Sequence, residues 1–107
     1  MARFVDVNIP GVGPARFARL QPYQRHRLQF ELRFAGIESV DGFDCRRAAR
    51  LVQIVAVPLD SGILLFPGAP GLEILQTRCS GDELRQLAAV AIAQNEVFEN
   101  AKDVGAA

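Results

Sequence analysis

The feature that most constrains this chain is an apolar segment in its middle, residues 45–57, which ends at Pro58. Arranged as a helix, the segment is apolar around most of its circumference. Its polar residues fall on one narrow stripe, made of Arg46, Arg47, Arg50 and Gln53. A helix with so little polar surface is stable only when other elements surround it. The sequence therefore predicts a helix at the centre of the core.

Flanking residues indicate where helices begin and end. Asp41 has the position of an N-cap for the central helix, and Asp44 would lie in its first turn, where a carboxylate suits the helix dipole. Pro58 disfavours helical backbone before it, so this helix is predicted to end at about Val57. A later helix is marked by a capping box, Ser80-Gly81-Asp82-Glu83, whose serine and glutamate satisfy free amides of the first turn.

The C-terminal third is predicted to be mostly helical. After the capping box, one helix face carries the residues expected in the core: Leu84, Leu87, Ala88, Ala91 and Asn95. Residues 95–103 would continue this helix or restart it after a kink. Residues 72–78 would form a short helix of about two turns, and the Pro- and Gly-rich residues 67–71 a stiff loop.

Residues 1–20 favour a β-hairpin. Residues 3–9 alternate apolar and polar side chains, as is typical of a strand, and the Pro- and Gly-rich residues 10–14 would turn the chain into a second strand over 15–20.

Residues 22–35 are ambiguous between a helix and a strand. Pro22 and Gly36 suit the two ends of a helix, whereas the apolar residues of 28–34 alternate with polar ones as in a strand. A helix here would be apolar on two opposite sides and would need two partners.

These elements predict a mainly α fold with a small N-terminal β-hairpin, or an α+β fold if residues 27–34 form a strand. A length of 107 residues is that of a single domain. Residues 1–20 would form the hairpin, 22–103 the helical body and 104–107 a frayed tail. No apolar run is long enough to span a membrane, and the N-terminus has no apolar core of signal-peptide length. A cytoplasmic location is therefore expected.

Charge is unevenly distributed although the net charge is zero. Residues 1–53 carry nine arginines and five acidic residues, a net charge of +4, and residues 54–107 carry three basic and seven acidic residues, a net charge of −4. This bipolar pattern suits head-to-tail self-association or neutralisation within one molecule. It favours nucleic acid only weakly, because proteins that bind it usually carry excess positive charge.

No combination of residues indicates a catalytic, cofactor or metal site. Cys45 and Cys79 belong to no Cys-x-x-Cys pair, and His26 is the only imidazole, so a zinc site would lack ligands. Whether the two thiols lie close together stays open. Gly11-Val12-Gly13 lacks the third glycine of a dinucleotide fingerprint, and no serine lies in a Gly-x-Ser-x-Gly motif. The sequence predicts a protein that is not an enzyme.

Two other features could contact a partner. Arg46 and Arg50 are spaced i, i+4 and share a helix face, where they could pair with acidic residues of the same or another subunit, stay solvated, or bind phosphates. The segment PLDSGILLFPG, residues 58–68, combines a turn at residues 60–62 with a short apolar piece, residues 63–66. This piece would be a compact anchor, either in the core or at an interface.

Four sequence elements follow one another along most of the chain, about residues 3–103. They are a short strand with a Pro-Gly turn (VDVNIPGVG), an Arg-rich segment that opens on Leu-Gln-Pro (ARLQPYQRHRLQFELRF), an apolar helix that runs into a Leu-Asp-x-Gly turn (RRAARLVQIVAVPLDSGILLF), and a closing helix (LAAVAIAQNEVFENAKD). This arrangement resembles the tail assembly chaperones of long-tailed bacteriophages and prophages. The loop 67–71 departs from that family, which often has an acidic stretch there.

The resemblance implies a non-enzymatic role without a cofactor. Such chaperones coat the tape-measure protein in the host cytoplasm before tail-tube subunits polymerise, and they self-associate. Helix-in-groove contacts would carry the binding. The expected contact residues are Phe30, Phe34, Leu64, Leu65, Phe66, Arg46 and Arg50. Two alternatives stay open: a small regulatory protein that binds nucleic acid through the arginines of 25–50, and another virion or host-interaction adaptor.

Overall fold

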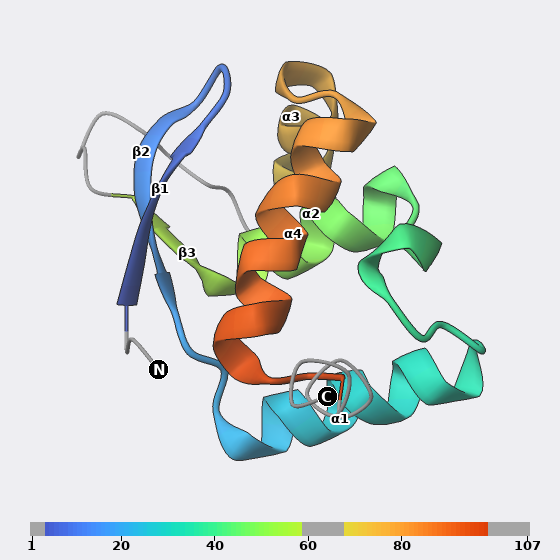
Figure 1. The fold of residues 1–107 in the computed structure, drawn as a ribbon. Helices are drawn as coiled ribbons and strands as arrows, with labels where there is room; N and C mark the ends of the chain where they lie inside the picture. The colour runs from blue at the N-terminus through green and yellow to red at the C-terminus, as the bar shows by residue number, and fades with distance from the viewer. Residues whose placement is uncertain (1–3, 59–67, 99–107) are drawn as a thin grey trace.

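Helix α2 (Cys45–Val55) lies at the centre of the fold, as the sequence predicts (Figure 1). The computed structural model describes residues 4–58 and 68–98. Helix α2 contacts the sheet, α3 (Gly68–Arg78) and α4 (Gly81–Asn95). The side chains that it buries are Ala48, Ala49, Leu51, Val52 and Val55. Three of its sides are thus covered, which explains why so few of its residues are polar.

The predicted hairpin is present and has a third strand beside it. Strands β1 (Phe4–Ile9) and β2 (Gly13–Ala18) pair antiparallel, and β3 (Ala56–Pro58) pairs antiparallel with the other edge of β2. The alternation of β2 buries Ala15 and Phe17 against the helices. The sheet and the helices therefore share one core.

The prediction that the central helix reaches Val57 is wrong, because α2 ends at Val55 and the chain continues as β3. Residues 56–58 pair with residues 15–17 of β2, so their backbone groups bond to a sheet edge that a helix would leave open. Pro58 is tolerated there because β3 is an edge strand.

The start of α2 also differs from the prediction. Asp44, and not Asp41, is the N-cap: its carboxylate accepts a hydrogen bond of 2.7 Å from the amide of Arg47. Asp41 lies in a separate 3-10 turn, Val40–Gly42. Between the two, Phe43 is buried and has extended backbone, so its insertion into the core delays the helix until Cys45.

Residues 22–34 form a helix, α1 (Pro22–Phe34), so the α+β alternative is wrong. Pro22 occupies the first turn, and the amide of Gln21 donates to the side chain of Gln24 at 2.9 Å. After Phe34 the chain leaves the helix through Gly36, whose φ of 74° suits a residue without a Cβ. Figure 1 shows α1 along the base of the molecule, below α2 and beside the lower end of α4.

Two predictions about the C-terminal half are corrected. Residues 68–71 are not a loop but the first turn of α3, where Pro70 needs no hydrogen-bonded amide. Helix α4 does not continue past Asn95, because Glu96 takes a left-handed conformation with φ of 50°. The remainder of 95–103, residues 99–103, lies outside the described residues, as do residues 104–107.

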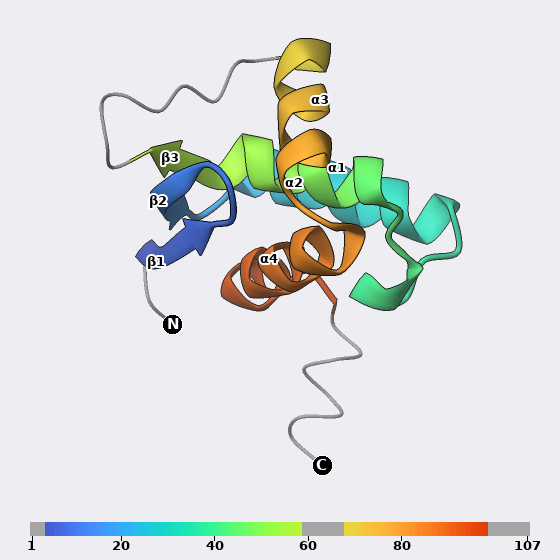
Figure 2. The same cartoon turned by 90° about the horizontal axis from the view of Figure 1, so that it is seen from above.

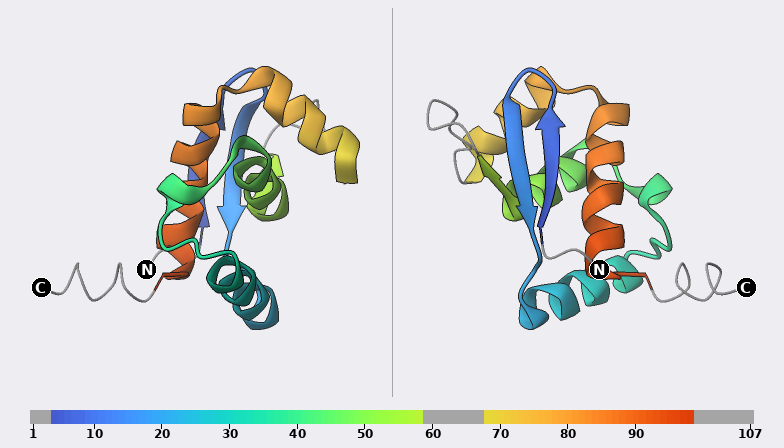
Figure 3. Two further views of the ribbon diagram at one scale, coloured as in Figure 1. Left: turned by 90° about the vertical axis from the view of Figure 1, so that its right-hand side faces the viewer. Right: turned by 60° about the vertical axis from the view of Figure 1, so that its left-hand side comes forward.

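The capping box of α4 is confirmed. The amide of Glu83 donates to the Ser80 hydroxyl at 3.1 Å, and the amide of Ser80 donates to the Glu83 carboxylate at 2.8 Å. The described chain is one small, mainly helical domain with a three-stranded antiparallel sheet. Figure 3 shows how the helices surround one side of that sheet, with α4 upright and α1 and α2 seen end-on in the left view.

Candidate functional site

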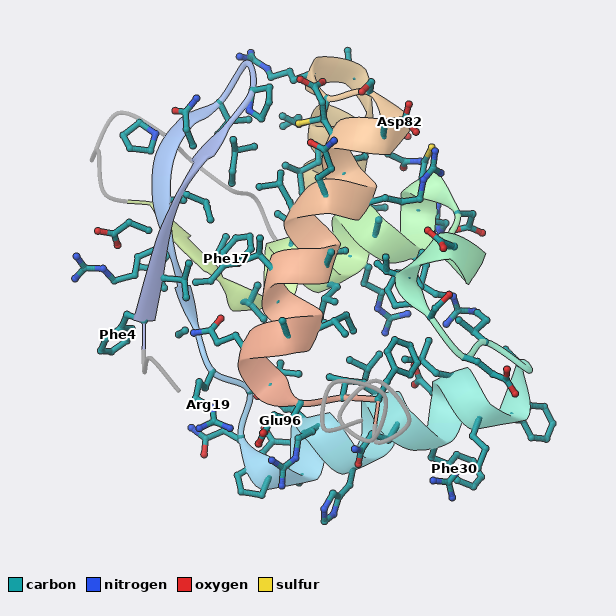
Figure 4. The ribbon with its side chains drawn as sticks, in the orientation of Figure 1. Phe4, Phe17, Arg19, Phe30, Asp82 and Glu96 are labelled. Atoms are coloured by element: carbon teal, nitrogen blue, oxygen red, sulfur yellow. The ribbon has the colours of Figure 1, made fainter. Side chains whose placement is uncertain are left out.

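Helix α1 carries a stripe of aromatic side chains that the fold leaves uncovered. Tyr23, Phe30 and Phe34 have 70%, 69% and 87% of their surface exposed, and Leu32 is the only buried residue of the helix. The rings of Phe30 and Phe34 stack with centroids 6.4 Å apart. Figure 4 shows Phe30 projecting away from the core. Of the two apolar sides that the sequence gives to this helix, one packs inward and the other has no partner among the described residues.

Beside this stripe, a groove of about 420 Å³ lies between α1 and α2. The two helices run alongside each other in opposite directions (Figures 1 and 2). Leu20, Leu28 and Leu51 contribute apolar surface to the groove, and Tyr23 connects it with the aromatic stripe. The other lining residues are Gln24, Arg27, Glu31, Asp44, Arg46, Arg47, Arg50 and Ile54. The groove thus combines an apolar lining with a concentration of arginines.

The two carboxylates of the groove are already engaged. Glu31 pairs with Arg27 at 3.5 Å on the same helix, and Asp44 caps α2. Within residues 4–58 and 68–98, Arg46, Arg47 and Arg50 form no ion pair with any carboxylate. Their charges therefore remain available, and the predicted pairing with acidic residues of the same molecule is absent from this part of the chain.

The position of α1, and with it one wall of the groove, depends on the end of α4. The Asn95 carboxamide oxygen accepts a hydrogen bond of 2.7 Å from the amide of Leu20, just before α1. The Gln29 side chain donates to the Val97 carbonyl at 3.0 Å. Gln94 donates to the Phe17 carbonyl at 3.0 Å and so ties the same end of α4 to β2. These contacts join α1, and with it one wall of the groove, to the end of α4.

The structure brings together part of the predicted set of contact residues. Phe30 and Phe34 are exposed on α1, and Arg46 and Arg50 line the adjoining groove. Leu64, Leu65 and Phe66 lie outside the described residues. Sequence reasoning placed Arg47 on the same polar stripe but missed Ile54 as a member of this surface. The signal for Ile54 was its i, i+4 spacing from Arg50, which continues the stripe begun by Arg46.

The cysteines and the possible metal ligands indicate no second site in the described part of the chain. Both cysteines are free thiols, and burial, with a smaller effect of the nearby Glu83, raises the pKa of Cys79 above its usual value. The Cys79 thiol donates to the Pro10 carbonyl at 3.3 Å. Among the described residues, no group of three or more His, Cys, Asp or Glu side chains could hold a metal ion. In that same part of the chain, no helix is long and apolar enough to cross a bilayer.

Comparison with protein-family models, with curated proteins and with solved structures finds no match for this chain. The aromatic stripe and the arginine-lined groove are therefore interpreted from their own geometry and chemistry.

Proposed function

We propose that this chain is a non-enzymatic tail assembly chaperone of a bacteriophage or prophage, which binds the tape-measure protein and self-associates in the host cytoplasm. The observation that carries this proposal is the uncovered aromatic stripe of α1 next to an open groove. Exposed apolar residues that gather on one surface are typical of sites where a protein contacts another protein.

The energetics of the stripe favour a protein partner. Full burial of one large apolar side chain stabilises a complex by about 1.5–3 kcal/mol, so Phe30 and Phe34 together could contribute several kcal/mol. Both lie on a helix, which orders their backbone before binding and so lowers the entropic cost of binding. A long helical partner with apolar residues at regular spacing has the surface to cover such a stripe repeatedly.

The order of the elements also supports the proposal. Among the described residues, an apolar central helix and a later helix that ends at Asn95 follow one another in the order expected from the resemblance to tail assembly chaperones. The charge pattern supports self-association, because the net positive half of one molecule would attract the net negative half of another.

The test is coexpression with the tape-measure protein encoded next to this gene. The chaperone function predicts that the two proteins copurify and that the tape-measure protein stays soluble only with its partner. Phe30→Ser with Phe34→Ser should abolish the complex without unfolding the domain, because both side chains are exposed. Phe4→Ser is the control, since Phe4 also has more than half of its surface exposed but lies on β1, away from α1.

Two results would refute the proposal. One is a genome without tail structural genes near this gene, or a neighbouring tape-measure protein that never copurifies. The other is a protein that stays monomeric in light scattering at every concentration tested, since the proposed chaperone self-associates.

The arginines of α2, which make no ion pair within the described part of the chain, favour one second candidate, binding to nucleic acid. Phosphate contacts by Arg46, Arg47 and Arg50 would make retention on heparin or duplex DNA fall steeply as the salt concentration rises. Retention of this kind, lost in Arg46→Gln with Arg50→Gln, would favour the nucleic-acid function over the chaperone.

A further inference from the structure

We infer that the groove between α1 and α2 binds an amphipathic helix of the partner that carries apolar residues along one side and carboxylates beside them. This inference rests on the proposed function and deepens it, because it names the chemistry of the partner segment and the residues that select it. The aromatic stripe adjoins the groove at Tyr23, so one bound helix could contact both.

The length of the groove corresponds to about three turns of a helix. Its walls are two antiparallel helices, α1 with 13 residues and α2 with 11 residues. At about 1.5 Å per residue, α2 offers a wall roughly 16 Å long. Each wall presents side chains at i, i+4 spacing: residues 23, 27 and 31 on α1, and residues 46, 50 and 54 on α2. A helix laid between such ridges packs in the way helices pack within a protein core.

The charges of the groove specify the partner's polar residues. Arg46, Arg47 and Arg50 stand along α2 without a carboxylate partner in the described chain, whereas Glu31 and Asp44 are both engaged. A guanidinium pairs with a carboxylate through two parallel hydrogen bonds, and such pairs are stronger than neutral hydrogen bonds. Partner glutamates or aspartates would supply the missing acceptors.

The groove also has a direction. Because α1 and α2 run antiparallel, Tyr23 at the start of α1 lies toward the same end as Ile54 near the end of α2. Ile54 is 51% exposed and lines the groove with Tyr23 and Leu20, so this end offers apolar side chains to a partner. Arg46 and Glu31 lie toward the opposite, charged end. A partner helix would therefore place its bulkiest apolar residues at the first end and its carboxylates at the second.

The same features disfavour a nucleic-acid strand in this groove. The lining contains two carboxylates, which repel phosphates, and several aliphatic side chains that offer phosphates no hydrogen bond. Single-stranded nucleic acid binds to surfaces where bases stack on aromatic rings along a basic track. Among the described residues that line the groove, Tyr23 is the one aromatic side chain, and Phe30 and Phe34 lie outside this lining.

The inference can be tested with two designed peptides and fluorescence anisotropy. Both are fluorescently labelled 18-residue helices with leucines at positions i, i+3, i+4 and i+7; one carries glutamates beside the leucines, and its twin carries lysines. We expect the glutamate peptide to bind the wild-type domain at least about tenfold more tightly than the lysine peptide, with a preference that shrinks at high salt.

Charge-reversed variants locate the binding site. Arg46→Glu with Arg50→Glu should weaken binding of the glutamate peptide at least about tenfold and should leave the far-ultraviolet circular dichroism unchanged, because both residues are exposed. The control is Arg19→Glu, which makes the same kind of charge change at an exposed residue outside the groove. It should leave the affinity within about twofold of the wild-type value, once the general change in net charge is screened by salt.

Equal binding of both peptides, no binding of either, or equal effects of the two charge-reversed variants would overturn the inference. So would a labelled 20-base-pair DNA duplex that binds the wild-type domain more tightly than the glutamate peptide does, and that loses its affinity for the variant Arg46→Glu with Arg50→Glu.

Capture of the tape-measure protein separates the groove inference from the proposed function. If capture requires Phe30 and Phe34 but not the arginines, the chaperone function stands and the groove inference falls. If the peptides behave as expected but the tape-measure protein is not captured, the groove inference stands and the function falls.

Discussion

Replacing Asn95 by alanine should both destabilise the fold and loosen α1. Asn95 is 1% exposed, and its side chain makes two hydrogen bonds. Its oxygen accepts from the Leu20 amide at 2.7 Å, and its nitrogen donates to the Ala91 carbonyl at 2.8 Å. The first bond joins residues 75 positions apart, and Leu20 itself lines the groove. Alanine keeps the helical backbone of α4 but removes both side-chain hydrogen bonds.

The expected loss follows from these two bonds. Leaving the partly buried Leu20 amide without an acceptor costs about 1–3 kcal/mol, and losing the second bond costs about 0.5–1.5 kcal/mol. Because water can reach the partly exposed Leu20, we expect a total decrease of about 2–3 kcal/mol in the free energy of unfolding. For a domain of this size, the midpoint of thermal unfolding should fall by about 10–20 °C.

Urea unfolding, monitored by circular dichroism, measures the change in the free energy of unfolding. Hydrogen exchange, monitored by NMR, measures the protection of the Leu20 amide. In Asn95→Ala that amide should lose more protection than the amides in the middle of α2. The matched control is Gln86→Ala, which removes an exposed amide side chain from the same helix and should change stability by less than about 0.5 kcal/mol. Equal stability of the two variants, with an unchanged Leu20 amide, would refute the reasoning.

Three further predictions concern packing and ionisation. A Cβ added at Gly81 would lie 2.7 Å from the Cys45 sulfur, so Gly81→Ala should cost about 1–3 kcal/mol of stability, and most of this cost should vanish in a double variant with Cys45→Ala. A thermodynamic cycle of urea unfolding checks this, and additive effects would contradict it. Because burial raises the pKa of Cys79, iodoacetamide should alkylate this thiol more slowly in the folded protein than in urea at the same pH, as mass spectrometry would show; equal rates would rule this out. The hydrogen bond of 2.6 Å from Arg16 lowers the pKa of Asp6, so the stabilising effect of this pair should be present above the pKa of the unfolded chain and be lost as the pH falls through the lower pKa of the folded state. NMR titration should show the Asp6 pKa rising in Arg16→Gln, and an unchanged pKa would contradict the assignment.

Features with a short-range cause could be predicted from the sequence. The capping box at Ser80 and Glu83 needs only groups within three residues, and the N-terminal hairpin needs only alternation and a Pro-Gly turn. The apolar circumference of residues 45–55 predicted a central helix in the same way. Part of the candidate site could be predicted too, because the two sides of α1 follow from helical spacing, and Phe30 and Phe34 lie on the side that the core leaves uncovered.

Other features could not be predicted because their cause lies far away in the chain. Residues 22–34 satisfy the patterns of both helix and strand, and they form α1 in a structure where Asn95 and Val97 accept hydrogen bonds from Leu20 and Gln29. The local sequence of residues 56–58 does not distinguish a strand from the end of a helix. They form β3 because the edge of β2 has free backbone groups beside them.

By itself the sequence determined the elements whose stability depends on neighbouring residues: the hairpin, the central helix and the helix capped at Ser80. Only the tertiary structure decided that α1 is a helix held apart from α2, that Arg46, Arg47 and Arg50 line the space between them, and that no carboxylate in the described chain reaches these arginines. The physical reason is the range of the interactions. Caps, turns and periodicity act over a few residues, whereas this groove depends on contacts such as that between Leu20 and Asn95, which lie 75 positions apart in the sequence.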